Sequence, residues 1–106
     1  MTPFTSGVAP LATTDTDAYT VAADKVARVT VTVSERAGGT PTYRLAILPS
    51  GETLGSQHYI VYDLAHTANG STEYGPFFLS EGDSIRAYAS DANTTYLVNG
   101  YTDDAS

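Results

Sequence analysis

Residues 27–34, within a predicted strand at 26–34, alternate strictly between apolar and polar side chains, and this alternation constrains the fold more than any other feature of the chain. The apolar positions all share one side of an extended segment: Ala27, Val29, Val31 and Val33. Because successive side chains of a β-strand point to opposite faces, the pattern predicts a strand with one buried face and one solvated face. A strand of this kind covers a core, as in a sandwich or a barrel.

Other short segments of this type follow, separated by turn signals such as Pro49-Ser50-Gly51 and Asn69-Gly70. We expect further strands at residues 19–21, 43–48, 57–64, 72–79, 85–90 and 96–101. No stretch shows the 3.6-residue period of a helix. The pattern predicts an all-β fold: a single antiparallel β-sandwich, jelly-roll or immunoglobulin-like, of about seven or eight strands.

Three of these strands have a consistent inward phase, which defines the expected core. It comprises Val29, Val31, Leu45, Ile47, Ile85 and Ala87. Pro76 cannot donate a backbone hydrogen bond, so the strand at 72–79 is expected at a sheet edge. The segment 57–64 is apolar on both sides, which predicts a strand that is covered on both faces.

The first sixteen residues lack any periodicity, and we expect them to form an extended N-terminal arm. Residues 17–106 would then form the sandwich domain, with a short acidic C-terminal tail. Phe4, Val8 and Leu11 are spaced apolar anchors in the arm. They favour an arm that becomes ordered only against a neighbouring subunit or shell, and the alternative is a tail without a role.

Charge, hydropathy and cysteine content exclude several classes of partner and of site. The 106 residues include 12 acidic and 5 basic side chains, which gives a net charge of −7. Such a chain would be repelled by nucleic acid and by anionic membrane surfaces. No apolar run approaches the roughly 20 residues that span a bilayer. Because cysteine is absent, the chain forms neither disulfides nor Cys-based metal sites.

Candidate catalytic and metal-binding residues are few. His58 and His66 would lie roughly 26 Å apart on one strand, too far to share a metal ion. The pairs Asp15/Asp17 and Asp91/Asn93 lack the spacing of a calcium loop and are better explained as turn residues. We therefore expect no catalytic, metal or cofactor site, and a protein that is not an enzyme.

Tyrosine is the prominent aromatic residue, with eight copies against three Phe and no Trp. Tyr is common in strands and also at interfaces, where one end of the ring is apolar and the other is wet. Tyr62 and Tyr88 lie opposite the faces assigned to the core. We interpret these two as contact residues for another subunit or a ligand, and the alternative is that they are ordinary strand residues.

Several segments resemble small β-rich virion proteins of tailed bacteriophages. Residues 19–25, YTVAADK, are similar to the opening YTVPAGK of that group, with Ala22 in place of Pro and Asp24 in place of Gly. Residues 79–89 are similar to its strand L-x-x-GD-x-[IV]-R-[AV]-YA. Residues 43–51 and 57–63 match further segments. Together the similar segments cover most of residues 19–93.

The resemblance implies a non-enzymatic structural protein on the surface of a phage particle, made in the host cytoplasm. The first hypothesis is a capsid decoration, or cement, protein that binds the major capsid protein at contacts between capsomers. Other virion proteins and further copies of itself, as a dimer or trimer, are the other expected partners. The second hypothesis is a tail, baseplate or fibre-associated module that touches a host glycan. A third is a stand-alone carbohydrate-binding or hydrolytic domain, which the absence of Trp disfavours.

Overall fold

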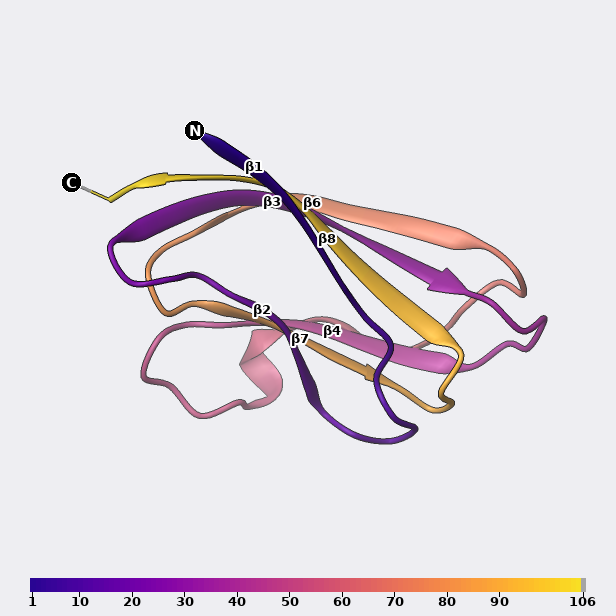
Figure 1. The fold of residues 1–106 in the computed structure, drawn as a ribbon. Coiled ribbons are helices and arrows are strands. Elements are labelled where there is room, and N and C mark those ends of the chain that lie inside the picture. The colour runs from indigo at the N-terminus through magenta and orange to yellow at the C-terminus, as the bar shows by residue number, and fades with distance from the viewer. Residues whose placement is uncertain (106) are drawn as a thin grey trace.

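Two four-stranded antiparallel sheets pack face to face in the computed structural model, which describes residues 1–105 (Figure 1). The first sheet contains, in spatial order, β1 (Thr2–Val8), β8 (Thr94–Asp104), β3 (Lys25–Glu35) and β6 (Ser71–Leu79). The second contains β2 (Thr16–Thr20), β7 (Ser84–Ala89), β4 (Thr42–Leu48) and β5 (Tyr59–Ala65). One short 3₁₀ helix, η1 (Ser56–His58), precedes β5. The predicted all-β sandwich is confirmed.

The strands pair in a nested order that identifies the topology. β4 pairs with β5, β3 with β6, β2 with β7 and β1 with β8, all antiparallel. The chain is thus one long hairpin rolled so that its successive strand pairs alternate between the two sheets. This arrangement is the eight-stranded jelly roll, and it decides between the jelly-roll and immunoglobulin-like alternatives.

The core lies between the sheets and contains the residues that alternation predicted. Val29, Val31, Leu45, Ile85 and Ala87 are all buried in one cluster. Ile47 is only partly buried but packs against the same cluster. β6 is an edge strand, as Pro76 indicated.

β5 differs from the expectation of a strand covered on both faces. Its outward side chains Ile60 and Tyr62 are 47% and 57% exposed, because β5 is an edge strand with its outer face open. The alternation is also interrupted. The register shifts near Asp63, which has a φ of 52°, and Leu64 consequently pairs with Tyr43. The sequence pattern alone could not distinguish a covered strand from an edge strand with an exposed apolar face.

The predicted N-terminal arm is instead part of the sandwich. β1 pairs with β8 in an unbroken register from Thr2 to Val8, and Phe4 stacks on Tyr19 with ring centroids 4.6 Å apart. Phe4 and Val8 both pack against the core, so the expectation that they wait for a partner is wrong. Leu11 lies in the link from β1 to β2 and is 72% exposed.

The acidic C-terminal segment is also partly strand. β8 continues to Asp104, whose carboxylate lies 2.5 Å from the Lys25 amine. The tail expected after residue 101 is therefore mostly paired with β3. The start of β1 and the end of β8 lie at the same end of the sandwich (Figure 1). Within residues 1–105, no helix has the length and apolar character needed to cross a bilayer.

Candidate functional site

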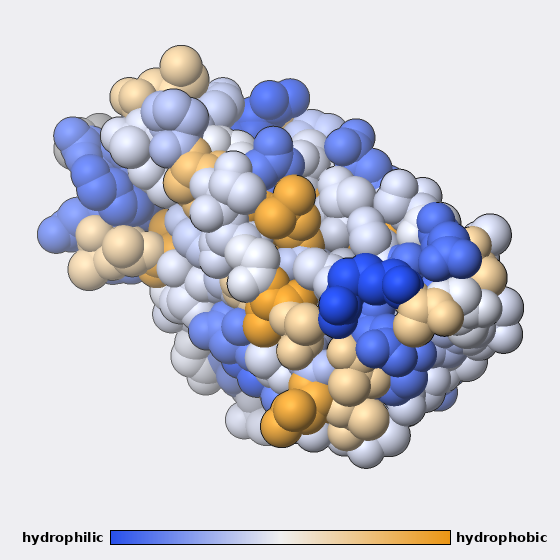
Figure 2. All heavy atoms as spheres, turned by 45° about the vertical axis from the view of Figure 1, so that its right-hand side comes forward, coloured by the Kyte–Doolittle hydropathy of each residue, from blue (hydrophilic) through white to orange (hydrophobic). Residues whose placement is uncertain are grey.

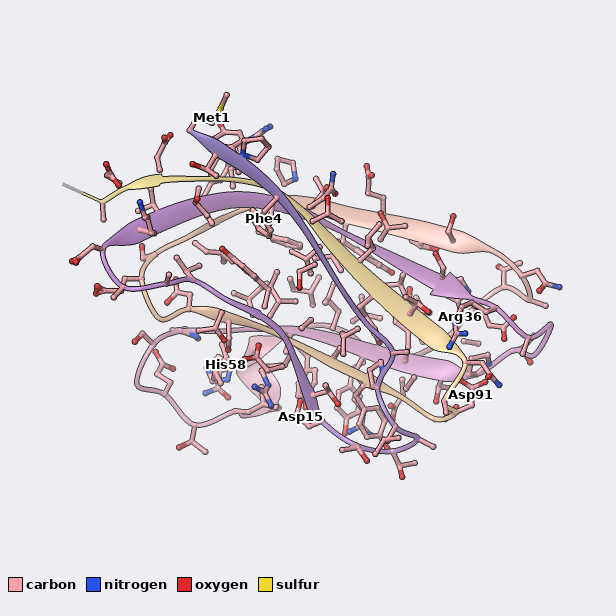
Figure 3. All side chains as sticks on the ribbon, viewed as in Figure 1. Met1, Phe4, Asp15, Arg36, His58 and Asp91 are labelled. Carbon is pink, nitrogen blue, oxygen red and sulfur yellow. The ribbon has the colours of Figure 1, made fainter. Side chains whose placement is uncertain are left out.

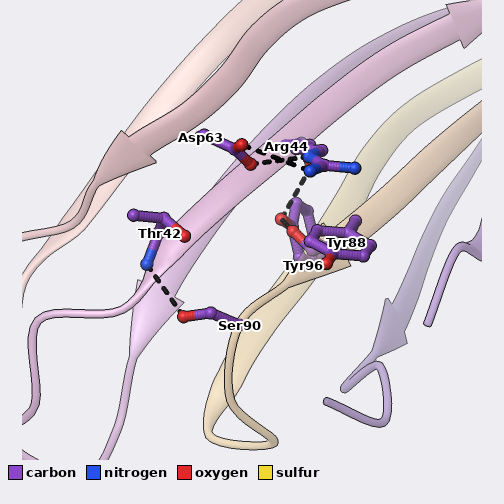
Figure 4. Close-up of polar contacts among 6 residues, drawn as sticks. All are labelled: Thr42, Arg44, Asp63, Tyr88, Ser90 and Tyr96. Atoms are coloured by element: carbon purple, nitrogen blue, oxygen red, sulfur yellow. Dashed lines mark hydrogen bonds and ion pairs between the residues drawn. The ribbon is translucent and has the colours of Figure 1, made fainter. Parts of the chain in front are cut away.

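A cluster of aromatic and charged side chains lies on the outer face of β4, β5 and β7 (Figure 4). The Arg44 guanidinium carbon lies 4.2 Å from the ring centroid of Tyr62 and 4.1 Å from that of Tyr88. Both distances are within the range of a cation–π contact. We call this group of Tyr62, Arg44 and Tyr88, together with Asp63, the arginine stack.

The strand register assembles the arginine stack. Arg44 lies between the inward residues Tyr43 and Leu45, so alternation turns it to the outer face. β7 places Tyr88 directly opposite Arg44. The irregular register of β5 then brings Asp63 alongside: Arg44 Nε donates to its Oδ1 at 2.6 Å, and Nη2 donates to Oδ2 at 3.2 Å.

This two-pronged ion pair fixes the charges of the stack. The hydrogen bond from Arg44 lowers the pKa of Asp63 below its ordinary value, and the same bond raises the pKa of Arg44. Both groups therefore remain charged near neutral pH and cancel each other. The resulting surface is aromatic, locally neutral and held in one geometry.

Protonation of Asp63 should reduce the stability of the folded protein in acid. Because its folded pKa is lowered, its contribution is present above the unfolded value of about 3.9 and is lost as pH falls through the folded pKa. We expect the melting temperature of the wild type to exceed that of Asp63→Asn at pH 6, and the gap to narrow below about pH 4. Thermal melts of both proteins from pH 6 to 2 measure this difference in melting temperature. The other acidic residues are common to both proteins, so their effects cancel in the difference. A constant gap would contradict the ion pair.

A buried tyrosine supports the stack from inside the sandwich. Tyr96 comes from β8 in the opposite sheet, and its hydroxyl lies 2.8 Å from the Arg44 carbonyl oxygen and 2.6 Å from that of Tyr88. Burial raises the pKa of Tyr96, so the hydroxyl stays protonated and can donate. This contact ties β4 and β7, which carry the stack, to the opposite sheet.

The structure brings together only part of the predicted contact set. Tyr62 and Tyr88 face outward, as their phase suggested, although Tyr88 is partly buried, and both also contact Arg44. Phe4 and Val8 lie in the core instead, and Leu11 stands apart from the stack. The sequence reasoning missed Arg44 and Asp63. Arg44 carried a signal, since it lies between the inward Tyr43 and Leu45. Asp63, however, directly follows the outward Tyr62, and alternation gave it none.

The histidines and acids that could suggest chemistry are separate and internally satisfied. His58 pairs with Glu52 at 3.0 Å, while the ring nitrogens of His66 lie 2.8 Å and 3.0 Å from two backbone carbonyls. Asp15 pairs with Arg86, and Asp91 accepts a hydrogen bond from a backbone N–H in its own loop. Figure 3 shows His58, Asp15 and Asp91 at different places in the fold. Among residues 1–105, no three metal-ligating side chains cluster.

Apolar side chains are also exposed elsewhere on the surface. On the face drawn in Figure 2, hydrophobic side chains form separate patches between hydrophilic ones. The outer face of the first sheet carries a hollow of about 330 Å³ beside the exposed Phe78, with Val26 and Tyr101 in its lining. Arg28 also lines it, 5.7 Å from the Phe78 ring centroid.

No model of a known protein family matches the chain, and no curated protein sequence matches it.

Proposed function

We propose that this protein is a non-enzymatic structural protein of a bacteriophage particle, and in the first place a capsid decoration protein bound at contacts between capsomers. The similarity of residues 19–25 and 79–89 to phage virion proteins supports this proposal. The jelly-roll fold is compatible with it, since jelly rolls recur in viral capsid domains. That support is by analogy of fold, because one fold hosts many functions.

The arginine stack is the observation that carries the proposal. Protein interfaces are enriched in Tyr and Arg. The residues that contribute most to binding lie near the centre of the interface, in well-packed pockets from which water is excluded. Tyr62 and the neighbouring Ile60 are each about half exposed and leave apolar area available. The internal pairing of Arg44 with Asp63 means that a partner would cover a locally neutral surface. A partner could attach to such a surface by apolar packing. Long-range charge would not help an acidic partner to bind, because the chain has a net charge of −7.

Attachment should therefore depend on Tyr62 more than on salt. Changing Tyr62 to Ser removes a ring that a partner would bury, and at roughly 25 cal/mol per Å² the loss should weaken binding about tenfold or more. Raising salt to about 1 M shortens the Debye length to about 3 Å and should release little protein. The measurement is occupancy on purified particles after addition of excess protein.

Two variants control this experiment. Tyr62→Phe keeps the ring and should stay bound, while Tyr101→Ser changes a tyrosine in the opposite sheet and should also stay bound. Release of the wild type by salt, with Tyr62→Ser still attached, would show that charge carries the contact and would contradict the proposal.

A second candidate is a tail, baseplate or fibre-associated module that touches a host glycan. It is favoured by a hollow beside Tyr59 and Tyr62 at the outer margin of the same sheet. Copy number separates the two candidates. A decoration protein would be present in many copies over the shell, whereas a tail module would be present in few.

A further inference from the structure

The hollow beside β5 is built by the tip of the long hairpin. It has a volume of about 420 Å³, within the range of small-molecule sites, and its lining comprises Leu54, Gly55, Ser56, Tyr59 and Tyr62. The Tyr59 and Tyr62 rings meet nearly at right angles, at 81°, with centroids 4.9 Å apart. One side of the hollow is therefore aromatic, and the other is formed by the segment that leads into η1.

The lining has no charged side chain, although the protein as a whole carries a net charge of −7. Its side-chain polar groups are the hydroxyls of Ser56 and the two tyrosines. Of the nearby charges, Asp63 is paired with Arg44, and Glu52 lies within hydrogen-bond distance of the His58 ring. An anionic ligand would find no cationic side chain in the lining, whereas a neutral ligand with hydroxyl groups would find hydroxyls that both donate and accept.

The wall opposite the tyrosines is held in place before any ligand arrives. The Gly55 N–H donates to His58 Nδ1 at 2.9 Å, and His58 Nε2, which then carries the ring proton, donates to Glu52 Oε1 at 3.0 Å. His58 is buried beneath this segment. Both ring nitrogens are satisfied, so the loop needs little further ordering on binding, which lowers the entropic cost of association.

From these features we propose that the hollow binds one ring of a neutral carbohydrate. A sugar ring presents a face of C–H groups that packs on an aromatic ring, and its hydroxyls need hydrogen-bond partners at the margin. Tyr59 and Tyr62 supply the aromatic surface, and the hydroxyls of Ser56 and the tyrosines supply the polar margin. The inference deepens the glycan-contacting candidate given above and rests on that candidate for its biological meaning.

The experiment is a titration of the isolated protein, followed by the NMR shifts of assigned backbone amides. The probes are methyl glycosides of glucose, galactose and mannose and N-acetylglucosamine, each up to about 50 mM, since a single-ring sugar is expected to bind with a Kd near 1 mM. At least one probe should shift the amides of residues 54–62 in a saturable manner. Tyr59→Ala should weaken that binding at least tenfold, while Tyr59→Phe should retain most of it.

Matched controls keep the outcome clear. Tyr101→Ala changes a tyrosine outside the hollow and should bind like the wild type, and the amide spectrum of each variant reports whether it is folded. Glucuronate should bind more weakly than the glucose glycoside. The proposal is overturned if no neutral sugar shifts these amides, if glucuronate binds better, or if the shifts lie on the opposite sheet. Location on the particle is measured separately, so failure of this test leaves the virion proposal standing.

Discussion

Replacing Gly100 with alanine is expected to destabilise the protein by about 3 kcal/mol or more, at the upper end of overpacking effects. Gly100 lies on β8 opposite Val29 of β3, where the two strands approach closely. A Cβ at this position would lie 1.9 Å from the Arg28 carbonyl oxygen and 2.8 Å from the Val29 Cα. Both atoms are backbone, so no side-chain rotation relieves the clash and the central strand pair must separate. Urea unfolding measures the loss.

Gly7 provides the control for this prediction. It lies on β1 in the same sheet, and a Cβ there would lie 3.4 Å from Leu97 Cδ1, at ordinary contact distance. Gly7→Ala should change the free energy of unfolding by less than about 1 kcal/mol. Equal stability of the two variants would mean that β3 and β8 do not approach as closely as the structure shows.

Replacing Val31 with Asp should also cost several kcal/mol, because it buries a carboxylate without a partner. Val31 is fully buried on β3, between Val98 of β8 and Tyr74 of β6. Leu97→Asp makes a comparable change on the partly exposed outer face of the same sheet. Thermal melts should show a large drop for Val31→Asp and a small one for Leu97→Asp. Equal melting temperatures for Val31→Asp and the wild type would show that the inward register of β3 is wrong.

Strict alternation explains why much of the fold could be predicted from the sequence. The predicted strand at 26–34 lies within β3, and residues 72–79 and 43–48 lie within β6 and β4. β3 and β4 each have one apolar face in strict alternation, whereas in β6 a register shift turns both Tyr74 and Phe77 inward. β1 was missed because its inward residues Phe4 and Val8 are separated by Ser6, which leaves too weak a local pattern. Its strand character depends on β8, more than 85 residues away in the sequence.

The candidate site could be predicted only in part, for a related reason. An outward phase was sufficient to select Tyr62 and Tyr88. The contact between Arg44 and Asp63, however, depends on a register shift in β5 that alternation does not encode. The loop that lines the hollow depends similarly on the hydrogen bonds of His58, whose partners Glu52 and Gly55 lie in an irregular segment. Irregular backbone, rather than strand periodicity, places these functional candidates.

The most direct test of the proposed function is the location of the protein on purified phage particles. Labelled protein imaged on the particles by electron cryomicroscopy should appear in many copies over the shell, at contacts between capsomers, with the outer face of β4, β5 and β7 toward the capsid. Protein confined to a few copies at the tail would contradict the capsid assignment and favour the second candidate. Absence of the protein from the particle would contradict the virion proposal altogether.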